Sequence, residues 1–287
     1  MDRDILSILS NGMKEFSKGQ RIIAKFILSN YDKAAFMTAG RLGKIVGVSE
    51  STVVRFATEL GYDGYPSMRK ALQEMIRSRL TSVQRIEVAK SMIDDTDIIR
   101  SVISSDMQNL QATLELMEQD SFNRCIDAII DAKNIYIVGM RTSTSLASFL
   151  GLYLNLLREN VHVVHDTAAS EIYEQIIRIG AGDLFIGISF PRYSTHTVDA
   201  MHFAKKMGAK AIAITDSSAA PFTGIADHSL YARSDMVSFL DSLVAPMSLI
   251  NAIIVAVGIR SKENVSGTFE RLERIWQEHD VYESSES

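Results

Sequence analysis

Hydroxyl side chains gather beside arginine in two short segments, each of which follows an apolar run. The first segment, "GMRTSTS" from Gly139 to Ser145, follows "NIYIV", and the second, "SFPRYST" from Ser189 to Thr195, follows "DLFIGI". Hydroxyl groups donate hydrogen bonds to anions, and a guanidinium group binds phosphate or carboxylate through two parallel hydrogen bonds. The two segments therefore predict a site for a small anion.

The residues around these segments alternate between strand and helix patterns. Apolar runs at 134–139, 161–164, 183–189 and 209–215 are typical of buried strands, "HSLYA" from His228 fits a fifth, and helical patterns lie between them. This alternation predicts a parallel sheet with helices on both faces, which binds ligands at the carboxyl ends of its strands. The candidate ligand-binding residues at those ends are Gly139, Arg141, Ser143, Ser145, Ser189, Arg192, Ser194 and Thr195.

The first 80 residues are wholly helical in pattern. Thr38 can cap a short helix through Val46, and Ser49 can cap a second one over residues 50–60. Gly47 lies between them and supplies the tight turn of a helix-turn-helix. The helical spacing predicts that the inward residues are Leu42, Ile45, Val46, Val53, Phe56, Ala57 and Leu60.

The outward face of the second short helix carries Ser51, Thr52 and Arg55. Side chains of these types contact phosphates and base edges when a helix enters the major groove. A plain helical hairpin with a polar exterior has the same pattern, so both interpretations stay open at this point.

Charge is distributed unevenly along the chain. Residues 1–90 contain 15 Lys and Arg against 9 Asp and Glu, a net charge of +6. The remaining residues contain 15 against 26, a net charge of −11, which together give the total of −5. A basic first 90 residues joined to an acidic remainder favours an anionic partner, such as nucleic acid, for the first 90 residues alone.

The segment "VGVSESTVVRFATELGYDGYPSMRKAL", from Val46 to Leu72, resembles the N-terminal domain of the RpiR/MurR family of bacterial transcription regulators. The shared pattern is VGVS-x-STV-x-RF-x-x-x-LGY-x-GY, followed by a basic helix. The resemblance implies a DNA-reading helix with tyrosines and basic residues flanking it near the DNA backbone. The residues it implies are Lys44, Ser49, Ser51, Thr52, Arg55, Tyr62, Tyr65, Arg69 and Lys70.

The two hydroxyl segments resemble the signatures of the sugar isomerase (SIS) domain, which this family carries after its helix-turn-helix. "VGMRTSTS" keeps the glycine and serine of the first signature, and "SFPRYST" keeps the first serine of the second. The resemblance implies that both segments bind a phosphorylated sugar. Arg141 and Arg192 stand where glycines are usual, and Pro191 replaces a serine. These departures favour a different phosphosugar or another small anion, such as a carboxylated sugar.

We therefore predict an all-α helix-turn-helix domain followed by an α/β parallel-sheet domain of the flavodoxin-like SIS type. The predicted boundaries are residues 1–80 for DNA binding, 81–120 for a helical connector and 121–287 for effector binding. An apolar stripe from Ile98 to Met117, on a helix beginning near Asp95, favours a homodimer or homotetramer. Ser121 is the expected cap of the next helix, and Pro246 is expected to interrupt an apolar helix near the C-terminus.

The resulting prediction is a transcriptional regulator that binds double-stranded operator DNA and a small anionic effector. Two other classes stay open: a phosphosugar isomerase using Glu171 as its base, and a sugar-phosphate-binding module that acts on protein partners. We expect no metal, no cofactor and no membrane span, since no apolar run reaches about 18 residues. Cys125 is expected to be a core thiol, and a single cysteine fits the cytoplasm.

Overall fold

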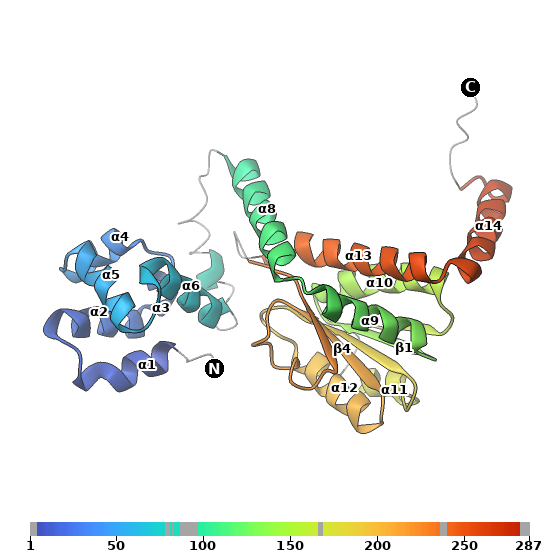
Figure 1. The fold of residues 1–287 in the computed structure, drawn as a ribbon, viewed down its shortest axis with the longest axis horizontal. Helices are drawn as coiled ribbons and strands as arrows, with labels where there is room; N and C mark the ends of the chain where they lie inside the picture. Colours follow the sequence, from blue (N-terminus) through green and yellow to red (C-terminus); the bar gives the residue numbers. More distant parts are fainter. Residues whose placement is uncertain are drawn as a thin grey trace. The chain divides into compact units, whose positions relative to one another are not determined.

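The computed structural model describes residues 5–77, 81, 83–86, 97–165, 169–235 and 240–281. The chain folds as two compact units, drawn in Figure 1. The N-terminal unit comprises residues 1–105 with 236–241, and the C-terminal unit comprises residues 106–235 with 242–287.

The described elements of the N-terminal unit before residue 80 are helical. They are α1 (Ile5–Asn11), the 3₁₀ helix η1 (Gly12–Lys14), α2 (Lys18–Ser29), α3 (Tyr31–Ala34), α4 (Ala39–Val46), α5 (Glu50–Glu59) and α6 (Gly64–Arg77). Three of these helices begin with a hydroxyl cap: Ser17 accepts from the N–H of Gln20, Thr38 from that of Arg41, and Ser49 from that of Thr52. Such caps satisfy N–H groups that a helix start leaves without intrahelical partners.

Helices α4 and α5 form the predicted helix-turn-helix. Gly47, between them, has a left-handed φ of 76°, which a residue with a side chain adopts at a cost. Leu42, Val53 and Phe56 are buried as expected, but Ile45 is 49% exposed, and its inward placement was wrong. The buried residues of α4 are Ala39, Leu42 and Gly43, and they define the side of the helix that faces the core. Ile45 lies outside this side.

The C-terminal unit contains a five-stranded parallel sheet. Its strands are β1 (Ile135–Gly139), β2 (Val161–Val164), β3 (Leu184–Ile188), β4 (Lys210–Thr215) and β5 (His228–Tyr231), in the order β2-β1-β3-β4-β5. Its helices are α9 (Gln119–Asp131), α10 (Ser143–Leu157), α11 (Ala169–Ile176), α12 (Thr195–Lys206), α13 (Val244–Arg260) and α14 (Lys262–Glu278). Helix α8 (Ile98–Leu116) begins in the N-terminal unit and ends in the C-terminal one. The two units confirm the predicted fold class.

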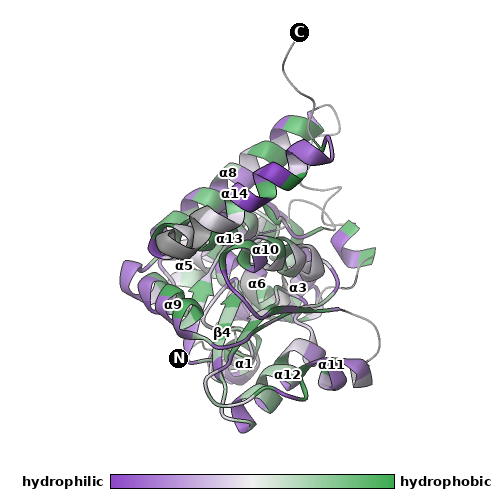
Figure 2. Cartoon of the chain, turned by 90° about the vertical axis from the view of Figure 1, so that its right-hand side faces the viewer, coloured by the Kyte–Doolittle hydropathy of each residue, from purple (hydrophilic) through white to green (hydrophobic). Residues whose placement is uncertain are grey.

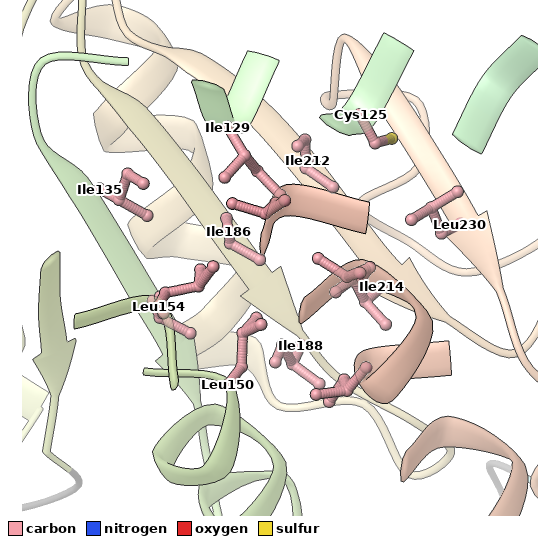
Figure 3. Packing of buried hydrophobic residues seen from close by; sticks show 14 of the residues in the cluster. Cys125, Ile129, Ile135, Leu150, Leu154, Ile186, Ile188, Ile212, Ile214 and Leu230 are labelled. Atoms are coloured by element: carbon pink, nitrogen blue, oxygen red, sulfur yellow. The ribbon is translucent and has the colours of Figure 1, made fainter. Parts of the chain in front are cut away.

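The helices divide between the two faces of the sheet. Helices α9, α10 and α13 cover one face, and α11 and α12 cover the other (Figure 1). Figure 3 shows the packing on the first face, where Ile186 and Ile212 of the sheet meet Ile129 and Leu150 of the helices. Both faces are apolar because a parallel sheet of this kind is buried on both sides.

Cys125 lies in the core of the first face, as expected of a core thiol. Its side chain is fully buried, and this burial raises the pKa of the thiol to about 12. A thiol with such a pKa carries almost no nucleophilic thiolate near neutral pH.

Two predicted helix boundaries were wrong. Glu118 occupies the N-cap position of α9, while Ser121 lies inside the helix and donates its hydroxyl to Glu118. Pro246 does not interrupt α13, because it falls in the first turn, where a proline removes no intrahelical hydrogen bond. The predicted start near Asp95 lies outside the described residues.

The last helix, α14, alternates hydrophilic and hydrophobic residues, as Figure 2 shows, and Phe269 packs against the sheet's first-face core. Among the described helices, none combines the length and apolar composition that a membrane span requires.

Candidate anion site and DNA-reading surface

The candidate anion site lies where β1 and β3 end side by side. Gly139, the last residue of β1, is in register with Ile188, the last residue of β3. From these two ends the chain enters helices on opposite faces, α10 after β1 and α12 after β3. A parallel sheet opens a crevice at such a point, and ligands of open α/β sheets bind there.

The loop after β1 is a tight turn that satisfies its own backbone. The N–H groups of Ser143, Thr144 and Ser145 donate to the carbonyls of residues 140, 141 and 142, at N···O distances of 3.1, 3.1 and 3.3 Å. A Cβ on Gly139 would lie 2.5 Å from the carbonyl oxygen of Ser143, so the turn requires glycine there. This loop can therefore offer a ligand side chains but few backbone donors.

The loop after β3 is organised around Ser189. This side chain is 3% exposed, and its Oγ accepts the N–H of Ser194 at 3.0 Å. The N–H of Ser189 donates to the carbonyl of Ile214, so the loop is also tied to β4. Ser189 therefore closes the loop, and its hydroxyl hydrogen remains the part that can donate to a ligand.

The start of α12 leaves backbone donors unused. In the described part of the chain, no hydrogen bond engages the N–H groups of Thr195, His196 and Thr197, and Ser194 makes no side-chain cap. The Thr197 hydroxyl is fully buried, also without a hydrogen-bond partner among the described residues. Unpartnered N–H groups at the positive end of a helix can bind an anion.

The predicted effector residues differ in burial. Gly139, Ser143 and Ser189 are buried and shape the loops, Ser194 is half-buried, and the exposed residues are Arg141, Ser145, Arg192 and Thr195. Sequence reasoning missed Thr197, which lies two residues beyond the quoted segment. It also missed Asp216, although this residue directly follows β4 and so lies at the same edge of the sheet.

Glu171, the residue considered for isomerase chemistry, lies exposed on α11, as does Glu174 one turn later. Helix α11 packs on the face of the sheet that α12 also covers.

The predicted DNA-reading residues lie on and around α5. Lys44, Ser51 and Arg55 are exposed and Thr52 is half-buried. The Oγ of Ser49 lies 2.9 Å from the Ser51 hydroxyl and 2.8 Å from the Thr52 hydroxyl, and it also accepts the N–H of Thr52. Ser49 therefore acts first as the helix cap and orients two hydroxyls at the start of α5.

Tyr65 does not belong to this surface, which corrects its predicted role. Its side chain is 3% exposed, and its hydroxyl donates to the carbonyl of Met37 at 3.0 Å. Burial raises the pKa of Tyr65 to about 12, so the phenol stays protonated. Of the other flanking residues, Tyr62 and Arg69 are half-buried and Lys70 is exposed.

Comparison with known proteins agrees with this two-part architecture. Residues 3–79 match the model of the helix-turn-helix domain of the rpiR family, and residues 128–256 match the SIS domain. The HTH-type transcriptional regulator HexR of Pseudomonas aeruginosa is 25% identical over 264 residues, covering 90% of each chain.

Two solved structures extend the comparison. The sugar isomerase domain of an RpiR transcription factor from Sphaerobacter thermophilus is 30% identical, with a TM-score of 0.60, and the match covers 62% of this chain and 99% of that one. The Vibrio vulnificus NanR protein, solved in complex with ManNAc-6P, is 23% identical over 94% of this chain and 98% of its own, with a TM-score of 0.57.

A helix-turn-helix domain joined to a sugar isomerase domain in one chain defines a DNA-binding transcriptional regulator. The chain belongs to the RpiR family of these regulators, which confirms the resemblance found in the sequence.

Proposed function

We propose that this regulator senses a small phosphorylated sugar at the carboxyl ends of β1 and β3, and that binding changes its affinity for operator DNA. The observation that carries the proposal is the start of α12, where three N–H groups and the buried Thr197 hydroxyl have no hydrogen-bond partner among the described residues. The ManNAc-6P complex of the related NanR protein supports a sugar phosphate as the ligand class.

Arg141 and Arg192 adapt this site to a strongly charged group. Both are exposed residues of the two loops that flank the β1 and β3 ends. Guanidinium groups bind phosphate through paired, charge-assisted hydrogen bonds, which are about twice as strong as neutral ones. The two arginines would supply positive charge beside the neutral N–H donors of α12. They would also replace the N–H groups of the first loop, which already donate within the turn.

At the other end of the chain, the exposed face of α5 reads the operator. Arg55 is placed to contact a guanine or a phosphate, and the hydroxyls of Ser51 and Thr52 to contact the DNA near the start of the helix. The protein works in the cytoplasm as a homodimer or homotetramer, because paired half-sites need two reading helices.

A surface on the C-terminal unit supports this self-association. A groove of about 590 Å³ runs between α8, α9 and α13, and its lining side chains are uncharged. Met107 and Leu114 on its α8 wall are 64% and 72% exposed. Met107, Leu110, Leu114 and Met117 follow the 3-4-3 spacing with which helices pack against helices. A second copy of the chain would cover these side chains.

The sugar site is proposed to sense its ligand and not to convert it. A ligand regulates a protein when it binds one of the protein's two conformations more tightly than the other. A binding site can do this without converting the ligand. Incubation with sugar phosphates should leave the substrates unchanged, and formation of an isomer that is lost in Glu171→Gln would favour the enzyme instead.

Isothermal titration with a panel of sugar phosphates, sugar acids and inorganic phosphate tests the ligand class. Arg192→Gly should weaken binding of the best ligand by about 1.5–3 kcal/mol, the range for a hydrogen bond to a charged group. Lys206→Ala, which removes an exposed charge near the far end of the same helix, is the matched control. Equal affinity in wild type and Arg192→Gly would place Arg192 outside the site.

A further inference from the structure

Tyr193 and Asp216 connect the loop after β3 to the end of β4. The Tyr193 hydroxyl donates to Oδ1 of Asp216 at 2.8 Å, and the Thr215 hydroxyl lies 3.3 Å from the same oxygen. Asp216 is 4% exposed and is the first residue after β4. A carboxylate buried to this extent requires hydrogen-bond donors, and a tyrosine from a neighbouring loop supplies one.

This contact fixes the loop at a point that its internal hydrogen bonds do not reach. The bond between Ser189 and Ser194 closes residues 189–194 on themselves, and the N–H of Ser189 ties the beginning of the loop to β4. Tyr193 stands between Arg192 and Ser194, just before the unpartnered N–H groups of α12. The position of Tyr193 therefore sets where its two neighbours stand relative to those donors.

We propose that Asp216 is a positioning residue of the ligand site, which acts through Tyr193 to hold Arg192 and Ser194 in their binding positions. The inference rests on the proposed function, since it assumes that the anion binds at the start of α12. A hydrogen bond from a tyrosine to a buried carboxylate is stronger than one to a neutral acceptor, and it restricts a loop that has no regular secondary structure. A preordered loop loses less conformational entropy when the ligand binds.

A negative charge at the edge of an anion site also carries a cost that a neutral acceptor would avoid. Asp216→Asn keeps an oxygen that can accept from Tyr193 but removes this charge. Because the amide oxygen is a weaker acceptor but remains one, positioning through the hydrogen bond predicts that the asparagine variant binds inorganic phosphate more tightly than Asp216→Ala does. Asp216→Ala removes both the charge and the acceptor, so comparison of the two variants separates positioning from electrostatics.

Titration of the full-length protein with inorganic phosphate and with glucose 6-phosphate provides the test. Tyr193→Phe and Asp216→Ala should each bind about tenfold more weakly, and the double variant should be no weaker than either single one, because both remove the same contact. Tyr173→Phe, a half-exposed tyrosine on α11, is the control and should bind as wild type does.

Several outcomes would overturn the inference. Wild-type affinity in both Tyr193→Phe and Asp216→Ala would show that the contact does not position the loop. Additive losses in the double variant would mean that the two residues act separately, and a loss in Asp216→Asn as large as in Asp216→Ala would show that the acceptor for Tyr193 is not the cause of the effect. If Arg192→Gly weakens phosphate binding while Tyr193→Phe does not, the proposed site stands and this inference alone fails. If neither variant weakens it, the proposed site itself is wrong.

Discussion

Arg141 shows why a glycine is usual at its position. Its backbone has a φ of 57°, in the left-handed region that favours glycine, and it begins the tight turn from β1 into α10. A residue with a Cβ in this region costs roughly 1–2 kcal/mol. Strained residues of this kind concentrate at binding sites, where the side chain serves a function that glycine cannot.

This strain can be measured by comparing two substitutions that both remove the guanidinium group. Arg141→Gly should be more stable towards urea than Arg141→Ala by about 1 kcal/mol, because alanine retains the Cβ and its strain. Both variants should lose affinity for the sugar phosphate. Equal stability of the two variants would show that the turn relaxes around a side chain and stores no strain.

At the scale of the element, α5 is the helix that meets DNA in our proposal. Arg55→Ala should weaken operator binding by about 1–3 kcal/mol if the guanidinium contacts a base edge, and binding should fall steeply with salt. Gel-shift titration against the promoter of its own gene, at two salt concentrations, measures both effects. Lys25→Ala, which removes an exposed charge from α2, is the control. Unchanged affinity of Arg55→Ala would remove Arg55 from the interface.

The turn between α4 and α5 depends on Gly47. A Cβ at Gly47 would meet open space, so the expected cost of Gly47→Ala is purely conformational. The substitution should destabilise the protein by about 1 kcal/mol in denaturant unfolding and weaken operator binding. Gly224→Ala also enters open space, but without a left-handed φ, and should change stability by less than about 0.5 kcal/mol. Similar costs at both glycines would contradict the conformational explanation.

At the scale of the whole molecule, the apolar groove between α8, α9 and α13 is central to the proposed self-association. Apolar side chains as exposed as Leu114 are common singly, but a continuous apolar surface indicates an interaction site. Burying a charge there would oppose association, because the charge would lose its hydration without gaining a partner.

Leu114→Glu should therefore shift the protein towards monomer in light scattering at micromolar concentration, while Ile177→Glu should leave the assembly unchanged. Ile177 is 62% exposed, close to the 72% of Leu114, but it lies outside the groove. A wild-type protein that scatters as a monomer of 31.9 kDa would refute the proposed dimer or tetramer.

Much of this molecule could be predicted from local pattern. The spacing of Val53, Phe56 and Ala57 predicted α5, and the alternation of apolar runs with helical patterns predicted β1 to β5 and a parallel sheet, but not the order of the strands. These features follow from neighbours in the chain, since helix period, strand period and capping each involve only a few consecutive residues. The helix boundaries at Ser121 and Pro246 were misplaced by a few residues, whereas the error at Tyr65 has a distant cause: the carbonyl of Met37 accepts its hydroxyl across 28 positions.

The same distinction runs through the candidate site. By itself the sequence determined that hydroxyls and two arginines follow adjacent strands, because strand ends and residue types are local properties. The tertiary structure decided which of them are exposed and which are buried. It buried Ser143 and Ser189, satisfied the N–H groups of the first loop, left those of α12 unpartnered and brought Asp216 to Tyr193. Burial and hydrogen bonding depend on segments that pack together from separate parts of the chain. The periodicity of one segment does not show which other segments pack against it.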